Sequence, residues 1–187
     1  MLFSKGIKRL LILTLCISIA GAGCAGTKGN IIGYSEENPE AKKFKDLSDR
    51  EALNMVVVIY NVEPRDNEDN LAKTIAIQTY MAEMKKRKSK YLKESGIFEV
   101  EVTEIDLKKW DDKKVAALYK YLDDKIYAGA WDRLSELPGD EKDLMVIRMT
   151  ARDVLYKEGR TRDVVRQSAE VAGHVLMTAL SIAASMI

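Results

Sequence analysis

The chain has 187 residues, with 30 lysines and arginines against 29 aspartates and glutamates. A net charge this close to zero gives the protein no electrostatic reason to bind nucleic acid. The length suits one domain with a substantial core, and the 32% charged residues with only three prolines favour a helix-rich domain.

The first 24 residues have the pattern of a secretory signal. Three basic residues lie within the first nine, and an apolar run follows from Leu10 to Ala20 before small residues lead into Cys24. A run of roughly a dozen apolar residues is shorter than the about 20 that a transmembrane helix needs. We therefore expect the chain to be exported and the signal to be removed.

The end of this signal, Gly21-Ala22-Gly23-Cys24, resembles the lipobox of bacterial lipoproteins. In that family the cysteine becomes the lipidated first residue of the mature chain. The resemblance implies a signal peptide of residues 1–23 and a lipid anchor, such as palmitate, at Cys24. Gly21 departs from the family pattern, where leucine is usual. The alternative is ordinary signal cleavage after Ala22.

The resemblance also implies a location in the bacterial cell envelope. Ala25 follows the lipidation site, which in this family favours the outer membrane over the inner one and a protein that faces the periplasm. Loss of the signal leaves 27 basic against 29 acidic residues, a charge of about −2. With Cys16 removed and Cys24 lipidated, no disulfide can form, so packing alone must hold the fold.

Composition divides the mature chain into two parts. Residues 24–45, rich in glycine, asparagine and charged residues, are predicted to form a lipid-anchored flexible tether. Residues 46–187 are predicted to form a single α/β domain that ends in an apolar C-terminal helix.

Three segments of this domain are predicted to be strands. Residues 54–62 (NMVVVIYNV) form a continuous β-branched and aromatic run, which is typical of a strand covered on both faces. Residues 97–106 (IFEVEVTEID) alternate between apolar and polar, which indicates a strand with one solvated face. Residues 144–150 (LMVIRMT) are predicted to be an internal strand.

Three long helices are predicted between and after these strands. They cover residues 71–94, ended by Gly96, then residues 112–137, capped by Asp111 or Asp112, and a last helix that starts near residue 161 after a turn at residues 157–160 (KEGR). The fold class that follows is α/β, a small mixed sheet of about three or more strands covered by three long helices.

The last helix carries small residues at helical spacing: Ser168, Ala172, Gly173, Ala179 and Ala183. Such residues let another element approach closely. We expect this helix to be buried against the sheet. Two alternatives remain open: an interface with a partner or a second copy, and membrane insertion, for which its uncharged run of about 17 residues is at the short limit.

A basic run, residues 85–93, ends the first long helix. Lysine and arginine there complement the helix dipole and solvate its outer face, which is the simplest interpretation. An anionic membrane leaflet or an acidic partner is the alternative.

No catalytic residue, metal ligand or cofactor site is predicted. His174 is the single histidine, and no nucleophile, dinucleotide or phosphate-binding motif accompanies it. Glu99, Glu101 and Glu104 are the obvious candidates if the protein were a carboxylate-dependent hydrolase of envelope polymers or lipids. Alternate carboxylates on an exposed strand face need no function.

Residues 55–102, which contain VVVIYNV, a long helix and YLKESGIFEVEV, resemble the first half of TolB-like periplasmic domains and of the curli-export lipoprotein. The resemblance implies an α/β fold and a role in envelope assembly. We therefore predict a lipid-anchored, non-enzymatic envelope protein that binds or scaffolds another envelope component. A subunit of an oligomeric membrane or secretion assembly, built through the last helix, is the alternative.

Overall fold

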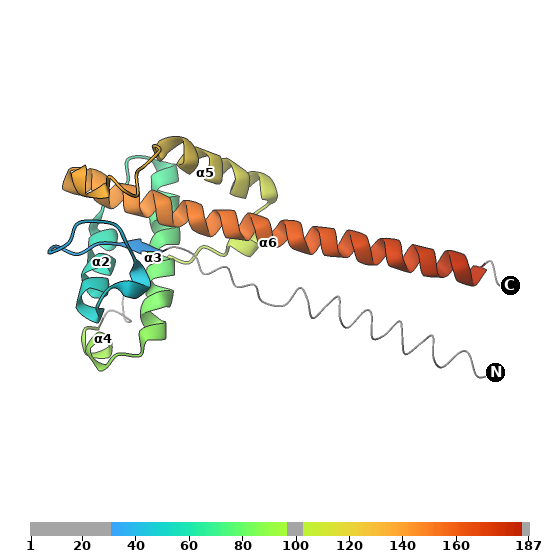
Figure 1. Ribbon diagram of the computed structural model, residues 1–187, viewed down its shortest axis with the longest axis horizontal. Helices are drawn as coiled ribbons and strands as arrows, with labels where there is room; N and C mark the ends of the chain where they lie inside the picture. Colours follow the sequence, from blue (N-terminus) through green and yellow to red (C-terminus); the bar gives the residue numbers. More distant parts are fainter. Residues whose placement is uncertain (1–30, 97–102, 185–187) are drawn as a thin grey trace. The chain divides into compact units, whose positions relative to one another are not determined.

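The structure is a computed structural model that describes residues 31–96 and 103–184 (Figure 1). The chain divides into two units, and the division falls inside one long helix. Gly29–Thr161 form the first, which we call the helical unit. The second contains the end of that helix, from Arg162 onward.

The predicted α/β fold is wrong, because the described residues are mostly helical. They contain the helices α2 (Asp49–Asn61), α3 (Asn67–Arg87), α4 (Lys90–Glu94), α5 (Asp112–Lys125) and α6 (Gly139–Ala184). Short 3-10 turns join them: η1 (Phe44–Asp46), η3 (Leu107–Lys109) and η4 (Leu134–Glu136). The described strands are β1 (Ile32–Gly33) and β2 (Lys42–Lys43), which pair antiparallel, with Ile32 opposite Lys43.

The segment predicted as the first strand, residues 54–62, lies in helix α2. Ser48 and Glu51 start this helix with a capping box, in which each side chain binds the backbone N–H of the other residue. The buried positions of α2 are Ala52, Met55, Val56 and Ile59. Their spacing of three and four residues is that of one helix face, which packs on the core despite the β-branched composition.

The segment predicted as the third strand, residues 144–150, lies in α6. All seven of these residues are buried, and α6 passes through the predicted turn at residues 157–160 without interruption. A helix buried on all sides needs apolar residues all round, and a short apolar run therefore cannot distinguish it from a buried strand. Of the second predicted strand, residues 103–106 form an extended loop without strand pairing, and residues 97–102 lie outside the described residues.

The two predicted internal helices exist, with other limits. Helix α3 starts four residues earlier than predicted and ends at Arg87, and the next residue, Lys88, has a left-handed φ of 52°. Helix α4 follows, and Gly96 with φ of 69° comes after it. The cap of α5 is Asp111, as predicted, and accepts from the backbone of Lys114, but the helix ends at Lys125 rather than near residue 137.

Residues 31–45, predicted as the second part of the tether, are packed onto helices. Residues 31–45 belong to the helical unit, where Ile32 and Phe44 are buried and β1 pairs with β2. The Phe44 ring packs edge-on against Tyr80 at 4.7 Å between ring centres, and the Tyr80 hydroxyl donates a hydrogen bond to the Ile32 carbonyl. Residues 24–30 lie outside the described part of the chain.

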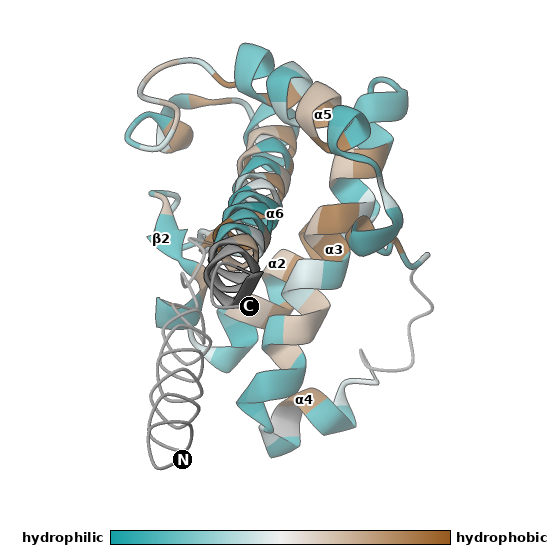
Figure 2. Cartoon of the chain, turned by 90° about the vertical axis from the view of Figure 1, so that its right-hand side faces the viewer, coloured by the Kyte–Doolittle hydropathy of each residue, from teal (hydrophilic) through white to brown (hydrophobic). Residues whose placement is uncertain are grey.

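The core of the helical unit lies between α2, α3, α5 and the first part of α6. Figure 2 views α6 nearly end-on and shows α2 and α3 side by side, with hydrophobic residues on both. The largest fully buried side chains come from all of these elements: Tyr80, Phe44, Met55, Ile59, Met84, Leu122, Leu134, Met145, Ile147 and Leu155.

Candidate functional site

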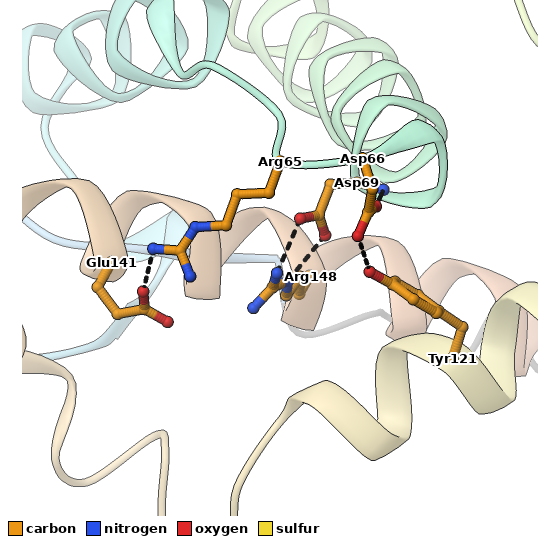
Figure 3. Close-up of polar contacts among 6 residues, drawn as sticks. All are labelled: Arg65, Asp66, Asp69, Tyr121, Glu141 and Arg148. Atoms are coloured by element: carbon orange, nitrogen blue, oxygen red, sulfur yellow. Dashed lines mark hydrogen bonds and ion pairs between the residues drawn. The ribbon is translucent and has the colours of Figure 1, made fainter.

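A polar cluster lies where the start of α3 meets α5 and α6 (Figure 3). At its centre, Arg148 of α6 donates from Nε and Nη2 to the two carboxylate oxygens of Asp69, each at 2.8 Å. Asp69 is fully buried and Arg148 is only 4% exposed. Two parallel bonds between charged groups fix both distance and orientation, so this pair joins α3 to α6 in one register.

The local sequence places Asp69 at this point. Asp66 caps α3 by accepting from the backbone N–H of Asp69 at 2.8 Å. Asp69 therefore lies in the first turn of the helix, where the dipole favours a negative charge. Arg148 lies within the buried stretch of α6, and its hydrogen bonds to Asp69 raise its pKa further above the usual value for arginine.

Asp66 also connects the cluster to α5. Its second carboxylate oxygen accepts a hydrogen bond from the Tyr121 hydroxyl (Figure 3). This bond, followed by the backbone bond from Asp69, lowers the pKa of Asp66. Burial and the same bond raise the pKa of Tyr121, so the phenol stays protonated and keeps donating. An exposed ion pair between Arg65 and Glu141 borders the cluster.

This arrangement is that of a structural clamp. The buried charges are paired, and every buried side-chain nitrogen or oxygen among the described residues has a hydrogen-bond partner. No substrate atom can reach Asp69, since it has no exposed surface. In the described residues we find no group of three or more histidine, cysteine, aspartate or glutamate side chains that could hold a metal ion.

A shallow cavity of about 300 Å³ lies beside the start of α2. Its lining includes Tyr34, Ser35, Glu51, Asn54 and Met55. Hydrogen bonds from the side chain and backbone of Ser48 lower the pKa of Glu51 to about 2. The Glu51 carboxylate is thus engaged in the helix cap. The other lining residue with a strongly shifted pKa is Tyr34, whose hydroxyl donates to Asp143.

The end of α6 is exposed, which corrects the expectation that the C-terminal helix is buried against a sheet. From Asp163 to His174 every residue is exposed, and so is Met177. The apolar exposed residues are Val164 at 47%, Val165 and Val171 at 63%, and Met177 at 67%. No described helix meets the length and hydropathy that a membrane span requires.

The predicted site residues are only partly described. Ser168, Ala172 and Gly173 lie on the exposed end of α6. Ala179 and Ala183 lie in the same helix, and their side chains are outside the described set. Cys24, Glu99 and Glu101 also lie outside it. Glu104 is exposed in the loop before η3.

Sequence reasoning missed the clamp of Asp69, Arg148 and Tyr121. One signal was available: Arg148 interrupts an otherwise apolar run, and a charge in a buried run requires an opposite charge as its partner. Nothing in the sequence shows which carboxylate serves. Comparison of the chain with protein-family models, curated proteins and solved structures finds no match.

Proposed function

We propose that this protein is a lipid-anchored, non-enzymatic component of the bacterial cell envelope that binds another envelope protein through the exposed end of α6. The observation that carries the proposal is the exposure of Val165 and Val171 on a helix that is otherwise well formed. Exposed apolar residues gathered on one element are typical of a protein interface.

These residues form one face of the helix, which we call the α6 apolar face: Val164, Val165, Ser168, Val171 and Ala172. Ser168 lies four residues from Val164 and Ala172 and three residues from Val165 and Val171, the spacing that puts side chains on one side of a helix. Arg166 and Asp163 lie on the other side, where they form an ion pair of 2.7 Å. The segment is therefore amphipathic, and the residues of its apolar side are exposed.

The small residues of this face indicate what binds there. Ser168 and Ala172 are four residues apart and both exposed, so a second helix can approach the backbone closely between the flanking valines. We propose that the partner presents a helix with a complementary apolar stripe. The lipobox-like sequence that ends at Cys24 supports the envelope location, because it would hold the partner and this chain at the same membrane.

A photo-crosslinking residue at Val171 tests this proposal in intact cells of a lipoprotein-processing bacterium. We expect one discrete crosslinked species with another envelope protein. The matched control is Ala117, which is exposed on α5 and should give none. Equal crosslinking at both positions, or none at Val171, would overturn the proposal.

The variant Val164→Glu/Val165→Glu, with the photo-crosslinking residue kept at position 171, adds a second test. It should abolish the crosslinked species without changing the helical circular dichroism of the purified chain, since both residues are exposed. The mass of that species decides the identity of the partner. A species of twice the chain mass would replace the heterologous partner by a second copy, and would make the protein a subunit of an oligomeric assembly.

A further inference from the structure

The first described residue, Ile31, and the basic end of α3 are linked by hydrogen bonds within the helical unit. Ile31 is the first described residue, and its carbonyl accepts from the Phe44 backbone N–H at 2.6 Å. The Phe44 carbonyl accepts from Arg87 Nη2, also at 2.6 Å. One residue therefore joins the entry of the chain to the last turn of α3.

Arg87 is the residue of the basic run that the fold uses. Its Nη1 donates to the Leu47 carbonyl at 2.8 Å and pairs with Asp49 at 3.2 Å, and its side chain is only 15% exposed. The guanidinium thus links α3 to η1 and to the start of α2. The lysines on either side of it are not needed for this contact.

Besides Lys86 and Lys90, which form ion pairs with Glu83 and Glu94, the run has three further lysines. Together with Lys43 of β2 they make up what we call the basic surface: Lys43, Lys85, Lys88 and Lys93. All four are exposed, and none makes an ion pair within the part of the chain that the structure describes. Lys43 lies directly opposite Ile32 in the β1–β2 pair. Between residues 83 and 94 the sequence holds six basic residues and two acidic ones, so this end of the unit is positive in a nearly neutral chain.

The chain length between the anchor and the unit limits where this surface can lie. Seven Cα steps separate Cys24 from Ile31, which allows about 25 Å at full extension. A lipid at Cys24 would therefore keep Ile31 within about 25 Å of the headgroups, and through Phe44 and Arg87 it would keep the basic end of α3 near the membrane. A flexible tether that reached residue 45 would have allowed a larger distance between the lipid and the helical unit. It would also have left the start of the unit without a fixed position beside α3.

From this geometry we infer that the basic surface binds anionic phospholipid headgroups beside the lipid anchor, and so orients the helical unit on the membrane. The inference rests on the proposed lipidation of Cys24. A single acyl signal binds membranes weakly, and a basic cluster is a common second signal. Each lysine near an anionic leaflet strengthens binding by about fivefold.

The test uses the full chain, processed and purified with its lipid, in vesicles of phosphatidylcholine with or without phosphatidylglycerol. A fluorophore at Lys90→Cys reports energy transfer to an acceptor on the headgroups, and one at Ala117→Cys on α5 is the control. Helix α4 lies at the C-terminal end of α3 and α5 lies at its N-terminal end, so the two labels report on opposite ends of the unit (Figure 1). We expect transfer from position 90 to rise with phosphatidylglycerol and to fall at high salt, while position 117 changes little.

The variant Lys85→Glu/Lys93→Glu should reduce that rise at least about fivefold, and the matched variant Lys109→Glu/Lys113→Glu should leave it intact. Energy transfer that changes with neither phosphatidylglycerol nor salt, or an equal loss in both variants, would overturn the inference. Neither result would bear on the proposed α6 interface.

The intact mass separates the two proposals. If it shows no lipid on Cys24, the anchor fails. Sedimentation with the same vesicles then decides the basic surface: selective binding to phosphatidylglycerol supports it, and equal binding or none to both vesicles rejects it.

Discussion

Arg148 and Asp69 are 79 residues apart in the chain and meet through two parallel hydrogen bonds of 2.8 Å, with almost no exposed surface on either side chain. Removing two charges from water is costly, and only their mutual bonds and the fixed geometry offset that cost. The intact pair therefore adds little to the free energy of unfolding, whereas the loss of either partner leaves a buried charge without its counter-charge.

This predicts a strong asymmetry between single and double substitutions. Asp69→Leu or Arg148→Met alone should lower the free energy of unfolding by about 3–5 kcal/mol. The double variant Asp69→Leu/Arg148→Met should lose much less, because no charge is left unpaired. Urea unfolding of the four proteins measures the difference, and Arg65→Ala, in the exposed pair with Glu141, is the control at about 1 kcal/mol or less. Additive losses in the double variant would show that the pair does not act as a unit.

The hydroxyl of Tyr80 holds the first strand in place. It donates to the Ile32 carbonyl and lies 3.3 Å from the Thr150 hydroxyl, all in the interior. Tyr80→Phe should cost about 1–3 kcal/mol, because the Ile32 carbonyl stays buried without its partner. Hydrogen exchange of the Phe44 amide, which is bonded to Ile31, should accelerate. Tyr60→Phe, on an exposed residue, should change neither quantity.

Two glycines make a matched pair for a backbone test. A Cβ on Gly33 would lie 2.5 Å from Leu47 Cδ1, whereas one on Gly159 in α6 would meet nothing within 4 Å. Gly33→Ala should therefore destabilise the unit by about 1–3 kcal/mol through overpacking. Gly159→Ala should stabilise it by about 0.5–1 kcal/mol, since alanine favours the helix. Thermal unfolding of both variants is the measurement, and a loss at Gly159 would argue against a continuous α6.

The cap of α2 makes stability depend on pH. The pKa of Glu51 is lowered from 4.5 to about 2 by its hydrogen bonds with Ser48. A carboxylate with a lowered folded pKa stabilises the fold above the unfolded pKa and loses that contribution as the pH falls. Between about pH 4.5 and pH 2, Glu51→Gln should show a smaller decrease in stability than the natural chain. Glu63→Gln, at an exposed position, should follow the natural chain, and identical curves for all three would contradict the role of the cap.

The fold was only partly predictable because its strongest local signals conflict with its packing. Residues 54–62 have high β propensity, and the helical spacing of Met55, Val56 and Ile59 becomes visible only when the window starts at the Ser48 cap. Local propensity is a weak preference, which tertiary burial overrides. The glycine at position 159 led to the prediction of a turn at residues 157–160. A helix whose preceding residues are buried tolerates one glycine, and α6 therefore continues through this position.

Only part of the candidate interface could be predicted: the sequence placed its small residues on one helix, but not on an exposed end of it. The exposed end of α6 carries the small residues that the sequence selected, including Ser168 and Ala172. Whether they were covered could not be predicted, because coverage depends on where the rest of the unit packs. The clamp was missed for a similar reason: Arg148 marks a need for a carboxylate, and only the arrangement of α3 and α6 selects Asp69.

The first described residues of the chain are held in place by contacts with α6. Tyr34 bonds to Asp143, 109 residues later, and Ile32 shares the Tyr80 hydroxyl with Thr150. Contacts of such long range form only after the whole intervening chain is present, and their loop-closure entropy slows folding. During synthesis, the helical unit therefore stays incomplete until the first turns of α6, as far as Thr150, have been made.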